Sequence, residues 1–366
     1  MKRIALLLIL MVGVASLSSC GGDEGETTAA GQTSAEKFRW RMVTSWPPNF
    51  PVFQEGTERF AEHVKVMSNG RLTIKSYAGG ELIPPLQVFD AVSQGTVEMG
   101  HSGAYYWAGK IPAAQFFTSV PFGLNAQGMN AWLYSGGGLE LWRETYAPHN
   151  MIPFPLGNTG VQMGGWFNKK IDSLDDLDGL KMRIPGLGGK VFAEAGGNAV
   201  LMAGGELYTA LERGAIDATE WVGPYHDKRL GLPKAAKYYY YPGWHEPGST
   251  LELVVNKGAW DKLPEDLQRI VEVAAQATDL WMLTRFEALN AEALSEIKAM
   301  EKVEMLPFPS EVTRKLKSLT HKTMAEQAEA DPQFAKVYAA YQAFQLKHDA
   351  WSEISERAYY DALMGK

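Results

Sequence analysis

The spacing of apolar positions along the chain predicts alternating strands and helices. In residues 38–42 large apolar side chains alternate with arginines, which is typical of a half-buried strand. The apolar residues of 53–67 share one helical face, and Gly70 follows where a helix would end. Residues 71–77 again look like a strand, and 86–94 like a helix. This rhythm predicts an α/β fold.

Two stretches of the chain resemble each other weakly. Residues 88–100 read VFDAVSQGTVEMG, and residues 207–219 read LYTALERGAIDAT. Each predicts a short helix, a glycine cap at Gly95 or Gly214, and a strand that carries an acid. We interpret them as one α/β unit in each of two lobes. Because helix–turn–strand units are common, chance similarity is the alternative.

The C-terminal part of the chain is predicted to be helical. Residues 265–306 contain neither glycine nor proline, and their apolar positions keep helical spacing. A helix that reached Met300 would be roughly 50 Å long at ~1.5 Å per residue, so we expect it to span both lobes. Further helices are predicted at 310–328 and 332–364. Their apolar surface would be buried either on the body or on a second chain in a symmetric homodimer.

Composition and charge narrow the class of protein. The chain has 366 residues, enough for two lobes with sizeable cores. Its 11 tryptophans and 15 tyrosines suit aromatic-lined binding surfaces. The net charge of −7 argues against nucleic acid as a partner, because such partners need a basic surface.

The N-terminus has the pattern of a secretory signal. Lys2 and Arg3 precede the apolar run 4–14, which is too short to be a good membrane span. Removing these two cations takes the charge from −7 to −9. The segment Leu-Ser-Ser-Cys that ends at Cys20 resembles a bacterial lipobox, in which the cysteine is lipidated and becomes the first residue. An ordinary cleaved signal with an incidental thiol is the alternative.

These features divide the chain into six parts. The stretch after Cys20 is rich in glycine, threonine, alanine and acids, and it lacks periodicity. We expect a lipoprotein signal peptide at 1–19, a flexible tether at 20–36, one lobe mainly at 37–155, the second mainly at 156–255, a long helix and a return strand at 256–306, and C-terminal helices at 307–366.

The most distinctive chemistry lies in residues 216–252. Glu220 and Trp221 follow a predicted strand, and the stretch continues through four tyrosines to PGWHEP. Ligands on open α/β sheets bind beyond the carboxyl ends of strands, and the same rule selects Tyr105 and Tyr106 in the first lobe. We expect both clusters to line a cleft between the lobes. An aromatic core with acids at its edge is the alternative.

Three further polar residues are candidates for this cleft. Asn158 and Gln162 offer amide groups in the glycine-rich run 157–168. Arg183 stands near the end of a predicted strand, just before Pro-Gly, and a guanidinium forms bidentate bonds with a carboxylate. A solvated surface arginine is the alternative.

Common catalytic motifs are absent from the sequence. We find no phosphate loop, dinucleotide fingerprint, HExxH, CxxC or GxSxG. His245 is adjacent to Glu246 but has no second histidine at metal-ligand spacing. Together with the export signal, this favours a binding protein over an enzyme. The alternatives are an exported lyase or esterase with Glu220 or Glu246 as general base, and a scaffold whose aromatic clusters bind a partner protein.

Several stretches together resemble the solute-binding subunits of TRAP transporters, the tripartite ATP-independent periplasmic uptake systems. They are RWRMVTSWPPNFP, GAYYWAGK with VPFGL, GGWFNKKI, DLDGLKMRIPG, ALERGAIDATEWVGP and YYYYPGWHEPG, within 38–260. EWVGP with YYYPGWHEP is similar to the branch that binds 2-oxo and 2-hydroxy monocarboxylates, such as pyruvate and lactate, beside a cation.

The resemblance implies a fold and a function. The fold is a two-lobed α/β periplasmic binding protein of type II-like form, with a long helix across both lobes. The protein would be anchored in the periplasm by its lipid and would deliver a small organic-acid anion to the TRAP membrane subunits without turnover. A C4-dicarboxylate receptor is the alternative within this family.

The resemblance also implies a role for each candidate residue. Arg183 would pair with the substrate carboxylate. A Na⁺ or Ca²⁺ ion would be held by Glu220, the main-chain oxygen of Trp221 and Glu246, since hard cations take oxygen ligands. Substrate contacts would come from Tyr105, Tyr106, Asn158, Gln162 and Trp221, and Gln162 would also reach the cation.

Overall fold

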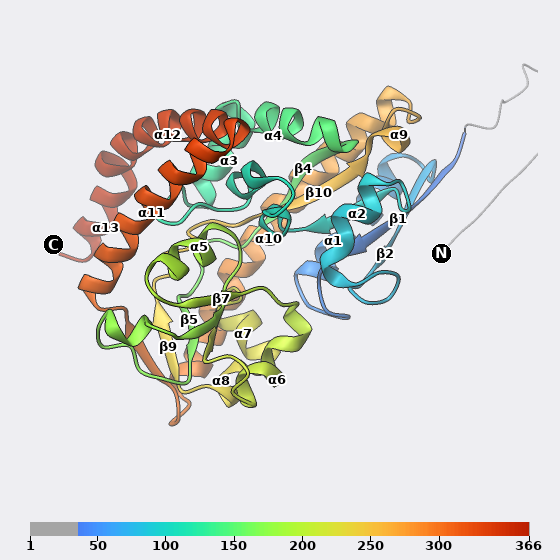
Figure 1. The fold of residues 1–366 in the computed structure, drawn as a ribbon. Helices are drawn as coiled ribbons and strands as arrows, with labels where there is room; N and C mark the ends of the chain where they lie inside the picture. Colours follow the sequence, from blue (N-terminus) through green and yellow to red (C-terminus); the bar gives the residue numbers. More distant parts are fainter. Residues whose placement is uncertain (1–35, 366) are drawn as a thin grey trace, which may run out of the picture. The chain divides into compact units, whose positions relative to one another are not determined.

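The computed structural model describes residues 36–365, whose strands form two sheets (Figure 1). The predicted signal peptide, Cys20 and almost all of the tether lie outside the described residues. Within 36–365, none of the helices combines the length and apolar character needed to cross a membrane.

The first sheet has the strand order β2-β1-β3-β10-β4. Strand β1 is parallel to both of its neighbours, whereas β10 is antiparallel to β3 and β4. The chain therefore returns to the first sheet in β10 before it adds the last strand, β11, to the second sheet. The strands are β1 (Phe38–Thr44), β2 (Leu72–Tyr77), β3 (Met99–Ser102), β4 (Met151–Asn158) and β10 (Thr250–Asn256).

Helices and 3₁₀ turns surround this sheet. Helix α1 packs on β2, α2 on β3 and β10, and α4 on β4. The elements are α1 (Phe53–Met67), η1 (Pro85–Gln87), α2 (Val88–Ser93), η2 (Ala104–Trp107), η3 (Pro112–Phe117), α3 (Ala126–Ser135), α4 (Gly138–Tyr146), η4 (Ala147–His149) and α9 (Lys257–Trp260).

The second sheet has the order β11-β9-β5-β8-β6-β7 and mixed strand directions. Its strands are β5 (Gly165–Phe167), β6 (Lys181–Arg183), β7 (Asn198–Val200), β8 (Ala218–Thr219), β9 (Tyr238–Tyr241) and β11 (Glu304–Pro307). Its helical elements are η5 (Asp175–Leu177), α5 (Gly186–Glu194), η6 (Gly204–Glu206), α6 (Leu207–Glu212), α7 (Pro224–Leu230) and α8 (Leu232–Ala235).

The two similar stretches of the sequence have the same local structure. Each follows a 3₁₀ turn and consists of a six-residue helix, a glycine with positive φ and the start of a strand. The glycines are Gly95 at φ 72° and Gly214 at φ 69°, values that disfavour a side chain. One copy ends in β3 of the first sheet and the other in β8 of the second. The predicted two-lobed α/β fold is confirmed.

A single long helix, α10 (Glu265–Lys298), contacts both lobes. It packs on α1 and β4 of the first lobe and on α7 of the second. Met282 is fully buried in this contact, where Gly56 and Gly157 leave room for its side chain. The carboxylate of Asp279 accepts a hydrogen bond from the main chain of Gly157 at 3.0 Å. The prediction that this helix spans both lobes is confirmed.

The two C-terminal helices α11 (Ser310–Ala330) and α12 (Pro332–Ser352) close the fold. Helix α11 packs on α5, and α12 packs on η3, α3 and α4. Phe334, Val337 and Tyr341 of α12 are fully buried. The first part of the tail is therefore buried on the body, which was one of the two alternatives.

The end of the tail is different, because its apolar side chains face outward. A π-helical turn at Glu353–Arg357 leads to α13 (Ala358–Leu363). The exposed large apolar residues from here and from the end of α12 are Leu346, Trp351, Ile354, Tyr359, Tyr360, Leu363 and Met364.

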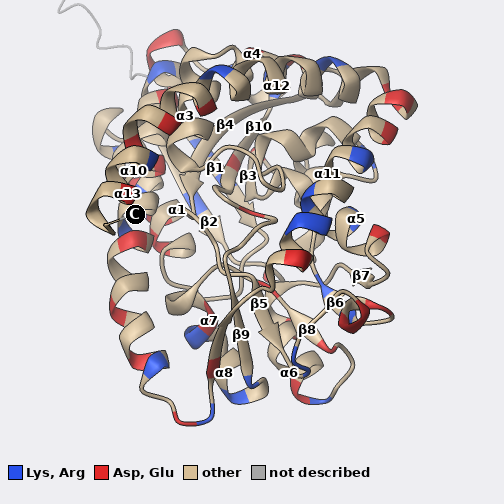
Figure 2. Cartoon of the chain, turned by 90° about the vertical axis from the view of Figure 1, so that its left-hand side faces the viewer, with Lys and Arg blue, Asp and Glu red and all other residues tan. Residues whose placement is uncertain are grey.

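Charged residues of both signs are interspersed along the outer helices in the view of Figure 2. Some of them form ion pairs between elements, such as Lys336 with Glu144 and Lys322 with Glu194. These side chains are about half exposed, and exposed pairs contribute little to stability. The apolar contacts of α12 therefore hold the tail in place.

Candidate binding site

The centre of the site is a buried ion pair at the ends of two neighbouring strands. Arg183 ends β6 in register with Thr219 of β8, so Glu220 emerges directly beside the guanidinium. Both side chains are 1% exposed, and Arg183 Nη1 donates to a carboxylate oxygen of Glu220. Its Nε donates to the main chain of Met202 at 3.2 Å. Burial disfavours the charged guanidinium, but the adjacent carboxylate raises the pKa of Arg183 above its ordinary value.

A tight turn brings Glu246 to Gln162. Gly243 N donates to Gln162 O at 2.9 Å, and Gln162 N donates to Glu246 O at 3.1 Å. A Cβ on Gly243 would lie 2.3 Å from Gln162 O, so this approach requires glycine. The side-chain amide of Gln162 then donates to the Glu246 carboxylate at 2.9 Å, and the Ser249 hydroxyl donates to the same oxygen.

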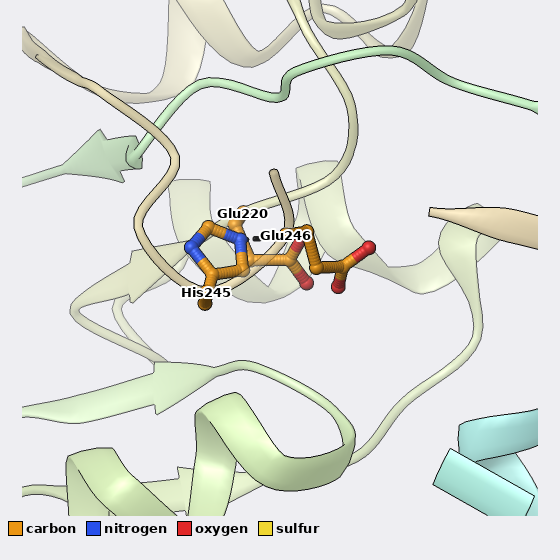
Figure 3. A group of neighbouring side chains, drawn as sticks. All are labelled: Glu220, His245 and Glu246. Carbon is orange, nitrogen blue, oxygen red and sulfur yellow. Dashed lines mark ion pairs between the residues drawn. The ribbon is translucent and has the colours of Figure 1, made fainter. Parts of the chain in front are cut away.

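Glu220, His245 and Glu246 lie close together (Figure 3). Each offers one ligand atom, and the three atoms lie within 4.8 Å of one another. All three residues are buried, and His245 Nε2 is 3.4 Å from Glu220 Oε2. Burial, followed by the charge of Glu220, raises the pKa of Glu246 to about 7. Two acids therefore share the site with the single guanidinium of Arg183.

Aromatic side chains from both lobes line a small cavity next to these charges. The hydroxyl of Tyr106 accepts a hydrogen bond from Arg183 Nη2 at 3.2 Å, which joins the first lobe to the ion pair. The rings of Trp46 and Trp221 meet edge to face across the lobes, at 6.2 Å between centroids. The lining residues are Trp46, Phe53, Tyr105, Tyr106, Thr159, Gln162, Trp221, Val222 and Leu251.

Several buried polar atoms of the site lack hydrogen-bond partners within residues 36–365. They are Oε1 of Gln162, Oε2 of Glu220, Nε1 of Trp221 and both ring nitrogens of His245. Buried polar groups are nearly always paired in native proteins, so these atoms point to a bound group. Two carboxylates and an amide oxygen form a donor set that fits a hard cation such as Na⁺ or Ca²⁺.

Most of the predicted site residues lie together. Asn158 has a different position: its amide donates to Thr250 Oγ1 at 3.2 Å and its oxygen accepts from Gly160 N at 2.9 Å. It connects β4 to β10 and does not line the cavity. The roles assigned from the resemblance stay predictions. The residues brought together are Tyr105, Tyr106, Gln162, Arg183, Glu220, Trp221 and Glu246.

Several residues of the site were not predicted from the sequence. His245 was set aside because it had no second histidine nearby, but its neighbour in space is Glu220. Its position next to Glu246 was the available signal. Trp46 and Phe53 line the cavity from the first lobe, and Thr159 accepts a hydrogen bond from Gln162 at 3.1 Å. In the sequence, Trp46 and Phe53 could not be distinguished from ordinary core residues.

The chain is similar to exported solute-binding proteins. Residues 42–331 match the family described as bacterial extracellular solute-binding protein, family 7. A monocarboxylate 2-oxoacid-binding periplasmic protein from Nostoc sp. is 47% identical over 359 residues, which cover 98% of this chain and 98% of that relative.

Two solved structures are similar in fold and sequence. A TRAP periplasmic solute-binding protein from Colwellia psychrerythraea, with bound calcium and pyruvate, has a TM-score of 0.87 and 44% identity. The match covers 89% of this chain and 100% of that chain. A protein of the same kind from Pseudoalteromonas atlantica, with bound sodium and pyruvate, has a TM-score of 0.87 and 43% identity. This match covers 89% of this chain and 99% of that chain.

A buried acid beside the site leads to a pH prediction. Glu252 of β10 is fully buried and accepts hydrogen bonds from Trp107 Nε1 and the Tyr146 hydroxyl. Burial raises its pKa from 4.5 to about 7. Between these values the folded protein binds more protons than the unfolded chain, so this acid lowers the free energy of unfolding as pH rises. Glu252→Gln should remove that contribution, on the order of 3 kcal/mol between pH 4.5 and 8.

Urea unfolding of the cation-free protein across this range measures the effect. Glu140→Gln, on the exposed face of α4, is the matched control and should keep the wild-type slope. Equal pH dependence in Glu252→Gln and the wild type would show that Glu252 does not titrate in this window.

Proposed function

The chain belongs to the family 7 bacterial extracellular solute-binding proteins, and on that premise we propose a periplasmic TRAP receptor for small 2-oxo monocarboxylates such as pyruvate. The observation that carries the proposal is the buried Arg183–Glu220 pair beside Glu246 in a small aromatic cavity. The name of the Nostoc relative and the pyruvate in both solved structures support this ligand class.

The charges of the site favour a cation bound together with the acid. With both carboxylates ionised, Glu220 and Glu246 exceed the one guanidinium of Arg183 by one negative charge. A monocarboxylate alone would worsen this imbalance in a site where charges are poorly solvated. Ca²⁺ together with a monocarboxylate neutralises the site, and Na⁺ does so if Glu246 keeps its proton. Glu220, Glu246, Gln162 and the main-chain oxygen of Trp221 would hold the ion.

The size and polarity of the cavity favour a small monocarboxylate over a C4-dicarboxylate. Arg183 is the only cationic side chain in the group of contacts described for the site, and it would take one carboxylate through its fork. The walls are mostly aromatic and offer no second guanidinium. A 2-hydroxy acid such as lactate presents the same pair of oxygens to a cation, so we include it in the ligand class. We expect binding without turnover.

The cation coupling gives the central prediction. The protein is stripped with chelator in sodium-free buffer, and pyruvate and lactate are titrated by calorimetry with and without Ca²⁺ or Na⁺. We expect the wild type to lose at least about fivefold in affinity without a cation, because the coupling between two ligands is typically ~1–3 kcal/mol. Glu220→Gln should weaken the binding of both cation and acid, and Arg183→Ala should weaken that of the acid.

The matched control is Glu252→Gln, which removes an equally buried acid that faces Trp107 and Tyr146 instead of the cavity. Its cation dependence should equal that of the wild type. Equal affinity for pyruvate with and without cation would contradict the bridging ion, and failure to bind any 2-oxo or 2-hydroxy acid would contradict the ligand class. Formation of a product would favour the enzyme alternative.

We further propose that the receptor is anchored by a lipid on Cys20, which the lipobox-like segment before it supports. The mature wild-type protein should sediment with membranes and carry diacylglycerol on its N-terminal residue. Cys20→Ser should abolish both properties, as measured by fractionation and intact-mass spectrometry. A wild-type protein that is unmodified and fully soluble after export would contradict the anchor.

The exposed end of the tail supports a symmetric homodimer. Trp351 and Ile354 are 62% and 73% exposed, and a cluster of such residues is unusual for a monomer. The double substitution Trp351→Lys with Ile354→Lys should convert a dimer into monomers, as measured by analytical ultracentrifugation. Leu280→Lys, at an equally exposed position of α10, is the control and should leave the dimer intact. A monomeric wild type at high protein concentration would contradict the proposal.

A further inference from the structure

Helix α7 is fixed rigidly to the second lobe by one buried carboxylate. Asp227 Oδ1 accepts hydrogen bonds from the main chain of Val222 and Gly223 at 3.2 and 3.1 Å. Its Oδ2 accepts hydrogen bonds from Trp166 Nε1 of β5 at 3.0 Å and from the Tyr239 hydroxyl of β9 at 2.7 Å. The helix therefore moves with the second sheet as one body.

The preceding residue, His226, reaches into the first lobe. Its Nε2 is 2.8 Å from the main-chain oxygen of Pro51, in the segment that leads into α1. Its ring lies among Phe50, Phe53 and Phe286, with centroids 4.4, 4.6 and 4.7 Å away. The side chain is fully buried, and burial lowers its pKa to about 3, so the ring is neutral. Because a carbonyl only accepts, Nε2 carries the proton and donates.

The acceptor belongs to a strained turn. Pro51 O also accepts from Phe53 N at 2.7 Å, which closes a three-residue turn around Val52. Val52 has φ 63° and ψ −52°, the rare form of γ-turn, and a β-branched residue strongly disfavours positive φ. Strain of this kind persists only where the surroundings enforce it, and it gathers at functional sites. The turn points a carbonyl at the other lobe.

We propose that His226 and the Pro51 carbonyl form a latch between the lobes, which stabilises the closed, ligand-bound form of the receptor. The inference rests on the proposed function in one respect, namely that the lobes close over a ligand. Phe53 connects the latch with the site, because its ring contacts His226 edge to face and the residue also lines the cavity. Phe50 and Phe53 also contact Trp221 edge to face, at 6.0 and 6.3 Å.

The latch would act on ligand affinity without touching the ligand. A contact that exists only in the closed form stabilises that form. It therefore raises the affinity for the ligand by the factor that corresponds to the free energy of the contact. The contact forms after the ligand has entered the open cleft. It should therefore slow dissociation and leave association unchanged. His226 is a positioning residue in this sense.

The test compares His226→Phe with the wild-type protein, both in full-length, cation-loaded form. Phenylalanine keeps an aromatic ring between the lobes but cannot donate to Pro51. We expect the dissociation rate of pyruvate, measured by stopped-flow tryptophan fluorescence, to rise about fivefold, as one hydrogen bond predicts. The association rate should stay constant. The melting temperature should fall for the pyruvate complex and stay unchanged for the unliganded protein.

Two further variants make the result specific. His226→Gln retains a donor and should recover part of the slow dissociation, whereas His321→Ala, at an exposed position of α11, should match the wild type throughout. An unchanged dissociation rate in His226→Phe would overturn the latch. So would an equal loss of melting temperature with and without pyruvate, because the contact would then be permanent.

Failure of the ligand class has a different signature from failure of the latch. If the wild-type protein binds no 2-oxo acid, the proposed ligand fails, and the latch is tested with the small molecules that copurify with the protein, identified and followed by mass spectrometry. Faster release of these molecules from His226→Phe than from the wild type supports the latch, and equal release overturns it.

Discussion

A guanidinium and a carboxylate, those of Arg183 and Glu220, lie in contact and almost out of reach of water at the ends of β6 and β8. Burying an ion costs several kcal/mol, and the attraction within a pair often only offsets this cost. The pair is therefore a poor explanation of stability. Its surroundings suit a site that binds an anion together with a cation, because the cation offsets the negative charge of the carboxylates.

The aromatic walls determine how strongly these charges act. Trp46 and Phe53 of the first lobe face Trp221 of the second, and together they keep solvent from the ion pair. In a dry site each electrostatic contact is stronger than in water, and each unpaired polar atom is more costly. Exclusion of water and neutralisation of the site are therefore linked, because unbalanced charge is costly in a dry site.

The local features of the fold follow directly from the sequence. Periodicity predicted α1 and α10, and the rule that ligands bind beyond strand ends selected Tyr105, Glu220 and Trp221. The contacts between distant segments do not follow from it. Gln162 and Glu246 are 84 residues apart, and the contact of His245 with Glu220 depends on how a turn after β9 crosses the end of β8. Tertiary packing sets these pairs, and no local pattern encodes them.

Asn158 shows how a polar residue in the predicted stretch can bond within the sheet instead of lining the cavity. Its partner in the sheet register is Thr250, so it stands where β4 leaves the first sheet and β10 returns to it. Its amide spans both strands, and the neighbouring Gly157 is held by Asp279 of α10. Two of the chain crossings between the lobes, after β4 and before β10, thus meet at this residue, and α10 is hydrogen-bonded to its neighbour. Arg183 and Glu220 stand at the ends of adjacent strands of the second sheet, so their pairing does not depend on how the two lobes are placed relative to each other.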